Sequence, residues 1–228
     1  TGELPPKVTE ARRRVLEEAA KEQVNAAELA RRAEVSSAVV KGLVDCGALA
    51  KLEISEDPPF AAPDTERSGK ELSDIQRAAA EQVCAGVRDG AFHVSLLDGV
   101  TGSGKTEVYL EAAAEALRCT TDAQVLVLLP EIALTQAAMS RFEARFGVQP
   151  VEWHSAIGQK ARRRAWREVA AGRARLVVGA RSALFLPFPN LRLIVVDEEH
   201  DPSYKQEEGV IYQARDLAVA RAKLGHCA

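Results

Sequence analysis

The sequence predicts an α/β domain in which helices cover both faces of a parallel β-sheet, preceded by a small α+β domain. Three observations lead to this fold class. Short runs in which every residue is apolar alternate with helical patterns, as is typical of strands buried on both faces. A glycine-rich loop, 99–106, opens one of the predicted helices. The acidic run Asp197-Glu198-Glu199-His200 directly follows one of the predicted strands.

The first 57 residues carry three helical patterns, each preceded by a residue type that caps helices well. Thr9, Asn25 and Ser36 occupy these cap positions, since short polar side chains satisfy the free N–H groups of a first turn. Residues 48–54 then alternate between apolar and polar as a strand does. Three helices followed by strands are the pattern of a winged helix, so we predict a winged-helix domain over residues 1–57.

The charge of this first domain weighs against tight DNA binding. Residues 1–60 contain 9 Lys and Arg against 11 Asp and Glu, a net charge of 9 − 11 = −2, and the predicted third helix offers only Lys41. Phosphate neutralisation supplies most non-specific DNA affinity. A packing or protein-contact module therefore remains as good an interpretation as a DNA-binding one.

A proline-rich stretch separates the two predicted domains. Pro58, Pro59 and Pro63 fall in a short polar segment that can continue neither a helix nor a central strand. The stretch is therefore a linker or the edge of a domain, and we place a linker at 58–68, with the larger domain occupying 69–228.

The larger domain repeats a strand–helix order. Because ligands of open parallel sheets bind at the carboxyl ends of the strands, and the glycine-rich loop and the acidic run both follow predicted strands, we expect one site there. The strands are predicted at 93–97, 125–129, 151–153, 176–178 and 193–196, and the helices at 105–118, about 135–146 and 160–171.

The glycine-rich loop fits the pattern G-x-x-x-x-G-K-[ST], whose backbone N–H groups surround phosphates. Its glycines let the backbone approach the phosphates more closely than a Cβ would allow. Lys105 is expected to reach the β- and γ-phosphates, and the Thr106 hydroxyl to ligate Mg²⁺. The expected nucleotide-binding residues of the loop are Gly99, Gly102, Ser103, Gly104, Lys105 and Thr106.

The acidic run lies 92 residues after the loop lysine (197 − 105). Asp197 can hold Mg²⁺, usually through water, and Glu198 can orient or deprotonate an attacking water. Charged residues also end strands simply because the chain meets solvent, but the position in register with the loop favours catalysis. His200 is either a structural histidine or a link between the γ-phosphate and a moving element.

A basic segment at 159–167 has two interpretations. It contains Trp166 and four arginines, a composition that nucleic-acid patches share. At helical spacing, however, Ala161, Ala165 and Trp166 can face the core while the arginines face water. We favour the solvated helix, with Trp166 in the core.

Composition narrows the functional classes. The net charge of −3 gives no global basic field, so nucleic-acid binding has to come from local patches. The four cysteines show no C-x-x-C pairing, which indicates reduced thiols rather than a metal site. No apolar run approaches the roughly 20 residues that span a bilayer. We expect a cytoplasmic protein without membrane association.

Four segments together resemble the primosomal replication-restart helicases of the PriA family, which are superfamily 2 DNA helicases. The resemblance covers about residues 69–228 and implies a RecA-like P-loop NTPase lobe, the first of two helicase lobes, behind the winged helix. The four segments read GVTGSGKTEVYL at 99–110, PEIALTQ at 130–136, GARSALFLPF at 179–188 and DEEHDPSYKQEEGVIYQARDL at 197–217.

The resemblance also assigns roles to residues outside the phosphate loop. Gln76 matches a glutamine that reads adenine, which implies ATP as the nucleotide. Thr135, Arg181 and Ser182 match motifs that follow the DNA backbone. An aromatic-rich loop that couples DNA binding to hydrolysis is matched by Tyr204, Lys205, Tyr212 and Arg215, although the tryptophan usual near Val210 is absent here.

By resemblance, the function is ATP-dependent 3′→5′ unwinding of DNA in the restart of stalled replication forks and in primosome assembly. The implied partners are forked DNA, primosome proteins and single-stranded DNA-binding protein. We expect the chain to be a fragment that lacks the second lobe, with its arginine finger, and a cysteine-rich zinc region. Such a fragment is expected to be nearly inactive.

Three alternatives remain at the level of sequence. A non-catalytic nucleotide-binding scaffold for primosome assembly would keep the fold, although intact Lys105, Thr106, Asp197 and Glu198 argue against degeneracy. A different superfamily 2 translocase would lack the segments at 179–188 and 197–217. A winged-helix transcription factor would leave the second half of the chain unexplained.

Overall fold

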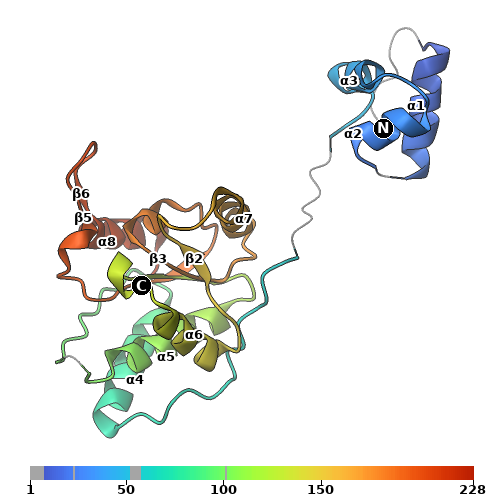
Figure 1. Cartoon of the computed structure of the whole chain (residues 1–228). Helices are drawn as coiled ribbons and strands as arrows, with labels where there is room; N and C mark the ends of the chain where they lie inside the picture. Colours follow the sequence, from blue (N-terminus) through green and yellow to red (C-terminus); the bar gives the residue numbers. More distant parts are fainter. Residues whose placement is uncertain (1–7, 23, 52–57, 101) are drawn as a thin grey trace. The chain divides into compact units, whose positions relative to one another are not determined.

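The computed structural model describes residues 8–22, 24–51, 58–100 and 102–228, and it divides the chain into two compact units, 1–56 and 57–228 (Figure 1). Each unit has an apolar core of its own. The two units are therefore described separately.

The first unit contains the three predicted helices, α1 (Glu10–Lys21), α2 (Ala26–Arg32) and α3 (Ser37–Asp45). The Thr9 and Asn25 side chains accept hydrogen bonds from the first turns of α1 and α2, as predicted. Ser36 occupies the cap position of α3 without a side-chain hydrogen bond. Val15, Leu29 and Leu43 form the centre of the core, one from each helix.

The strand expected at 48–54 is absent from its described part, because residues 48–51 form no strand. The chain leaves α3 through a turn in which Gly47 has φ = +76° and the Leu49 N–H donates to the Leu43 carbonyl. This hydrogen bond holds the start of the segment against α3, so the segment does not pair with another strand. Residues 52–54 lie outside the described residues.

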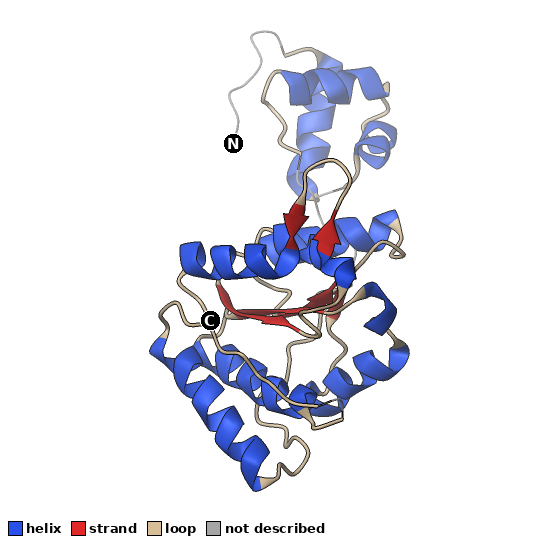
Figure 2. Cartoon of the chain, turned by 90° about the vertical axis from the view of Figure 1, so that its left-hand side faces the viewer, coloured by secondary structure: helices blue, strands red, loops and turns tan. Residues whose placement is uncertain are grey.

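The second unit is built on a four-stranded parallel sheet in the order β2-β3-β1-β4. In Figure 2 this sheet is seen edge-on between two layers of helices. Both faces are buried, which confirms the predicted α/β architecture and explains why the central strands carry apolar residues without alternation. The strands are β1 (Gln124–Leu128), β2 (Val151–Trp153), β3 (Leu176–Gly179) and β4 (Leu191–Val196).

Two apolar clusters flank the sheet. One contains residues of α4 (Asp74–Asp89), α5 (Lys105–Cys119) and α6 (Gln136–Phe146). The other contains residues of α7 (Gln159–Ala170) and α8 (Ala214–Gly225). The predicted helices α5, α6 and α7 begin and end within one residue of their expected bounds, whereas α4 and α8 were not anticipated as elements.

The strand predicted at 93–97 is not formed. The segment leads into the phosphate loop as an extended, exposed chain, with Val94 and Leu96 in solvent. A strand needs a free sheet edge, and Ala228 hydrogen-bonds to Arg192 and Ile194 along the outer edge of β4. The segment 93–97 thus pairs with no described strand, and the place beside β4 is occupied by Ala228.

Residues 58–68, predicted as a linker, pack against the second unit. The Asp64 N–H donates to the Phe146 carbonyl at 2.9 Å, and Arg67 donates to the Ala144 carbonyl at 2.8 Å. Arg164 donates to the Pro58 carbonyl and stacks over the Phe60 ring. These contacts make the segment an edge of the second unit rather than a free linker.

The expectation that Trp166 lies in the core is wrong. On α7 the buried residues are Ala165, Glu168 and Val169, while Trp166 is 50% exposed. The helix is rotated by about one residue from the expected orientation, because Val169 fills the core instead.

The segment after the acidic run forms a small hairpin. The 3₁₀ helix η3 (Pro202–Tyr204) leads into β5 (Lys205–Gln206), which pairs antiparallel with β6 (Tyr212–Gln213) before α8 begins. A second 3₁₀ helix, η2 (Arg181–Phe185), follows β3. None of the described helices combines the length and the apolar character that crossing a bilayer requires.

Candidate nucleotide site

The phosphate loop turns sharply into α5 at the carboxyl edge of the sheet. Gly102 and Gly104 have φ values of +81° and +85°. Residues with a Cβ rarely adopt such backbone conformations. Gly104 is the N-terminal residue flanking α5, and no side chain caps the first turn. The N–H groups and the positive end of the helix dipole are thus directed at the loop, an arrangement that favours an anion.

Gly104 also lies close to the side chain of Gln76. A Cβ at this position would come within 2.2 Å of Nε2 of Gln76. That nitrogen donates to the Ser103 carbonyl at 2.7 Å, while Oε1 of the same side chain accepts the Ser73 N–H at 2.9 Å. Gln76 therefore closes the capping box of α4 and contacts the phosphate loop with the same amide.

Lys105 curves back over its own loop. Its Nζ donates to the Gly99 carbonyl at 2.6 Å and to the Val100 carbonyl at 3.4 Å. The charge is therefore held at the mouth of the loop, where the pattern predicts contact with phosphates.

Asp197 lies at the end of β4 and is fixed from two sides. Its Oδ2 accepts from the Tyr109 hydroxyl at 3.1 Å, and its Oδ1 accepts the Glu198 N–H at 3.0 Å. Burial, and then the negative charge of Asp197, raise the pKa of Tyr109, to which Thr106 also hydrogen-bonds. Tyr109 thus stays protonated between the two predicted Mg²⁺ ligands, Thr106 and Asp197.

Glu198 has a left-handed backbone, with φ = +47°. This conformation costs roughly 1–2 kcal/mol for a residue with a Cβ and turns the chain away from the strand just after Asp197. The Glu198 side chain lines the same cavity as Lys105. His200 is largely exposed, with Nε2 3.5 Å from Oε2 of Glu198, which is compatible with either role considered for it.

A cavity of about 750 Å³ joins the loop to the acidic run. Its size suits a nucleotide, and its lining fits both a phosphate chain and Mg²⁺, which takes few protein ligands and keeps several waters. Of the predicted nucleotide and catalytic residues, the lining includes Gln76, Gly102, Ser103, Gly104, Lys105, Thr106, Asp197 and Glu198.

Among the lining residues that sequence reasoning missed, two contact a predicted Mg²⁺ ligand. Tyr109 lies one helical turn after Lys105, so the i, i+4 spacing on α5 was a usable signal. Arg141 on α6 donates to the Thr106 hydroxyl at 3.3 Å. Its position had no signal in the sequence, because it depends on how α6 packs beside α5.

The residues predicted to follow DNA lie along the same edge of the sheet. Thr135 caps α6 through the Ala138 N–H and lines the cavity. Arg181 donates to the Ser203 and Lys205 carbonyls at 2.9 and 2.6 Å, which ties η2 to the start of the hairpin. Ser182 is exposed on η2.

Tyr204, one of the residues matched to the aromatic-rich coupling loop, is buried instead of exposed to a DNA ligand. It is 1% exposed, and its hydroxyl lies 3.0 Å from the Leu128 carbonyl and 2.7 Å from the Asp197 carbonyl. The ring is buried beneath the hairpin because it fills the core between the ends of β1 and β4. Base stacking by Tyr204 is therefore excluded in this structure.

The other predicted coupling residues lie on the two hairpin strands and in the first turn of α8. Tyr212 is half-buried and meets the exposed ring of Phe185 edge to face, with centroids 5.3 Å apart. Lys205 is exposed and pairs with Glu207. Arg215 pairs with Glu199 at 2.8 Å, so the acidic run contacts the first turn of α8.

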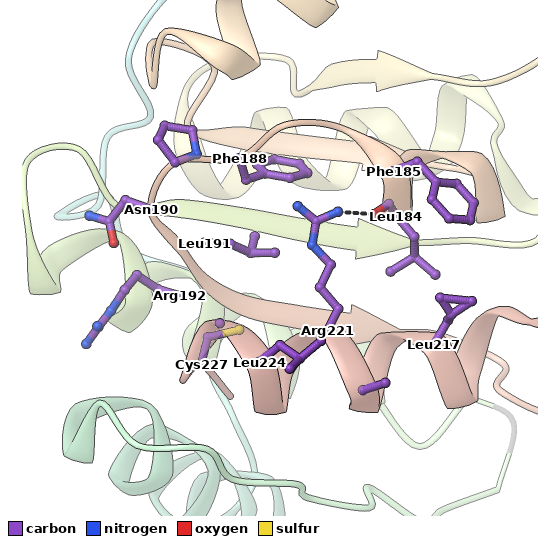
Figure 3. Close-up of a pocket in the computed structure, with 13 residues that line it drawn as sticks. Leu184, Phe185, Phe188, Asn190, Leu191, Arg192, Leu217, Arg221, Leu224 and Cys227 are labelled. Carbon is purple, nitrogen blue, oxygen red and sulfur yellow. Dashed lines mark hydrogen bonds between the residues drawn. The ribbon is translucent and has the colours of Figure 1, made fainter.

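A second cavity, of about 510 Å³, lies near the opposite end of β4 (Figure 3). Arg221 crosses it, donates to the Leu184 and Leu186 carbonyls and stacks over Phe188. Burial lowers the pKa of the Arg221 guanidinium. This side chain thus joins η2 to α8, and none of the predicted site residues lines this cavity.

A parallel sheet with a glycine-rich phosphate loop and an acidic strand end at one cavity defines the class of P-loop nucleotide-hydrolysing lobes. The family model described as DEAD/DEAH box helicase matches residues 73–225. The chain belongs to this helicase family, and ATP with Mg²⁺ is what the reaction of such a family uses in general.

The curated relatives carry the name replication restart protein PriA. That of Chlamydia pneumoniae is 44% identical over 186 residues, 81% of this chain and 24% of the relative. That of Bacillus subtilis is 41% identical over 207 residues, 90% of this chain and 26% of the relative. That of Haemophilus influenzae is 49% identical over 132 residues, which are 58% of this chain and 18% of the relative. The predicted resemblance is confirmed, and the chain spans about a quarter of the length of these relatives.

Proposed function

We propose that the chain is the first ATP-binding lobe, with a preceding winged helix, of an ATP-dependent 3′→5′ DNA helicase that restarts stalled replication forks. The observation that carries the proposal is the cavity shared by Lys105, Thr106, Asp197 and Glu198. Similarity to restart proteins supports the biological context.

In the proposed reaction, the phosphate loop and Lys105 bind the β- and γ-phosphates of ATP. Thr106 and Asp197 hold Mg²⁺, which when bound neutralises charge on the phosphates. Glu198 accepts a proton from the attacking water. Tyr109 positions Asp197 through its hydrogen bond at 3.1 Å. His200 relays the state of the site to the neighbouring segment.

Coupling to DNA is proposed to run through the hairpin. Thr135, Arg181 and Ser182 lie on the segments that follow strands β1 and β3, where phosphate contacts are expected. The ion pair between Arg215 and Glu199 supports a mechanical link between the acidic run and α8. Tyr212 and Lys205 remain the hairpin side chains proposed to contact DNA.

The remaining proposals concern the longer protein. A second lobe supplies an arginine to the γ-phosphate, and a cysteine-rich region binds zinc. Forked DNA, primosome proteins and single-stranded DNA-binding protein are the partners. Because the catalytic arginine lies outside this chain, the isolated chain is proposed to bind ATP weakly and to hydrolyse it very slowly.

A chimera tests the proposal. The matching region of the Bacillus subtilis relative is replaced by this chain, and ATPase activity is measured with and without forked DNA. Stimulation by DNA that disappears in Lys105→Ala but persists in Lys223→Ala, an exposed lysine on α8, supports a DNA-coupled motor. ATPase activity that ignores DNA would count against a DNA-coupled motor, whereas ATP binding without hydrolysis in the chimera would favour the non-catalytic nucleotide-binding scaffold.

The isolated chain gives a second test. Turnover by the chain alone within the usual enzyme range, about 1–10³ s⁻¹, would contradict a mechanism that needs two lobes. ATP binding without turnover, lost in Lys105→Ala, is the expected result.

A further inference from the structure

The outer face of α7 is basic and carries no acid. We define this face as the residues that point away from the sheet around Arg163: Gln159, Lys160, Arg163, Trp166, Arg167 and Ala170, all of which are exposed. The only acid of the helix, Glu168, is buried and paired with Arg173 at 2.7 Å. Of its three basic residues, Lys160 and Arg167 already take part in interactions within the chain, so Arg163 carries the charge that the inference uses.

Trp166 lies on this face, one helical turn after Arg163. A tryptophan that is half-exposed beside arginines has an open ring surface, the property that base stacking requires. Arg163 makes no hydrogen bond or ion pair within the described part of the chain. Both side chains are therefore available to a ligand.

The other arginines of α7 hold the helix in place. Arg162 donates to the His154 carbonyl at 3.0 Å and stacks over Trp153, which joins the start of α7 to the carboxyl end of β2. Arg164 stacks over Phe60. With these two side chains anchored on its flanks, α7 keeps the side that carries Arg163 and Trp166 turned away from the sheet.

We propose that the α7 outer face binds single-stranded DNA, with Trp166 stacked on a base and Arg163 on a phosphate. The span from Lys160 to Arg167 is about 10 Å, the length of about three stacked nucleotides. Such a contact combines base stacking with phosphate neutralisation. It does not depend on the DNA sequence, because every base can stack on an aromatic ring. The inference rests on the proposed function, because it gives the helicase lobe a DNA contact outside the nucleotide site and the hairpin.

The binding is tested by fluorescence of the 228-residue chain. The chain has two tryptophans, so Trp153→Phe leaves Trp166 as the reporter while keeping a ring beneath Arg162. Titration with oligothymidylate is expected to quench this fluorescence, and a polyglutamate of equal charge is expected not to. Equal quenching by polyglutamate, or none by the oligonucleotide, would overturn the proposal.

Variants then test each side chain by fluorescence anisotropy of labelled oligothymidylate. Trp166→Ala is expected to weaken binding about 5- to 100-fold. Arg163→Ala is expected to lower the slope of log affinity against log salt by about 0.7. Lys223→Ala, an exposed lysine on α8, is the matched control and is expected to change neither quantity. Unchanged affinity in both α7 variants would overturn the proposal.

The two proposals fail separately. Loss of ATP binding with DNA binding still dependent on Trp166 would count against the proposed function alone. ATP binding that depends on Lys105, together with DNA binding that ignores Trp166 and Arg163, would count against the α7 contact alone.

Discussion

The Tyr109 hydroxyl lies 3.1 Å from Oδ2 of Asp197, so a residue of the helix that follows the phosphate loop holds the carboxylate at the end of β4. These two residues are 88 positions apart in the sequence. The bond couples the two halves of the nucleotide site. Any shift of α5 relative to β4 changes the direction in which Asp197 points.

Tyr109→Phe is expected to weaken Mg²⁺-dependent ATP binding without unfolding the chain. The ring still fills its place, and only the donor to Asp197 is removed, a loss of about 1 kcal/mol, or about fivefold in affinity. Titration of a fluorescent ATP analogue with and without Mg²⁺ measures this. Tyr212→Phe, on the hairpin, is the control. An equal loss in the absence of Mg²⁺ would show that Tyr109 does not act through the metal ligand.

Gln76→Glu is expected to reduce the preference for ATP over GTP. The carboxylate can still accept the Ser73 N–H, but it lacks the amide N–H, which donates to the Ser103 carbonyl at 2.7 Å in this structure and would be the donor to the adenine edge when ATP binds. A lost hydrogen bond corresponds to roughly a fivefold change in affinity. Calorimetric titration with ATP and with GTP measures the preference. Ser73→Ala removes the other half of the capping box but keeps the Gln76 amide, so this variant is expected to keep the purine preference. If both variants alter selectivity equally, helix capping is the cause.

Glu198→Gly and Glu198→Ala are expected to separate strain from catalysis. Glycine relieves the left-handed conformation at φ = +47°, so it should raise the free energy of unfolding by about 1 kcal/mol relative to alanine. Both variants should lower the ATPase rate of the chimera at least 100-fold, since general-base catalysis contributes about that much. Urea unfolding and steady-state rates measure the two effects. Activity retained by either variant would remove Glu198 from the reaction.

Tyr204→Phe is expected to destabilise the second unit by about 1 kcal/mol, because it removes the hydrogen bond of a buried hydroxyl. The ring itself is retained, so DNA affinity is expected to stay unchanged whether the ring is buried or stacks on DNA. Tyr204→Leu provides the decisive comparison: a stacking ring would lose DNA affinity, whereas the buried ring seen here predicts lower stability at unchanged affinity. Thermal melting and anisotropy of labelled DNA give both values.

Stability is expected to fall above about pH 10. Burial raises the pKa of Tyr109 and of Tyr204 above 10.0, the ordinary value. Above pH 10 the unfolded chain therefore binds fewer protons than the folded one, and the free energy of unfolding drops by about 1.4 kcal/mol per pH unit for each such tyrosine. Urea denaturation between pH 8 and 11 measures the slope. Tyr109→Phe should reduce the slope by the contribution of one tyrosine, about 1.4 kcal/mol per pH unit. An unchanged slope would mean that Tyr109 ionises freely in the folded chain.

Local pattern was enough to predict most elements of the second unit. The fully apolar runs at 125–129 and 176–178 became β1 and β3, and the short β-branched and aromatic run at 151–153 became β2, because runs of this length bounded by turns favour strands in a buried sheet. The same logic failed at 93–97, where His93 and Ser95 interrupt the apolar pattern and Ala228 occupies the outer edge of β4. Pairing partners are decided by the whole fold, which local pattern does not contain.

The sequence by itself determined the kind of site, because the phosphate loop and the acidic run depend on residue types at short spacing that any backbone of this class places at the strand ends. Only the tertiary structure decided which side chains complete it. Arg141 reaches Thr106, Tyr109 holds Asp197, Tyr204 is buried and Trp166 is exposed. Burial and contact depend on how elements distant in sequence pack together, and that packing is a property of the assembled core.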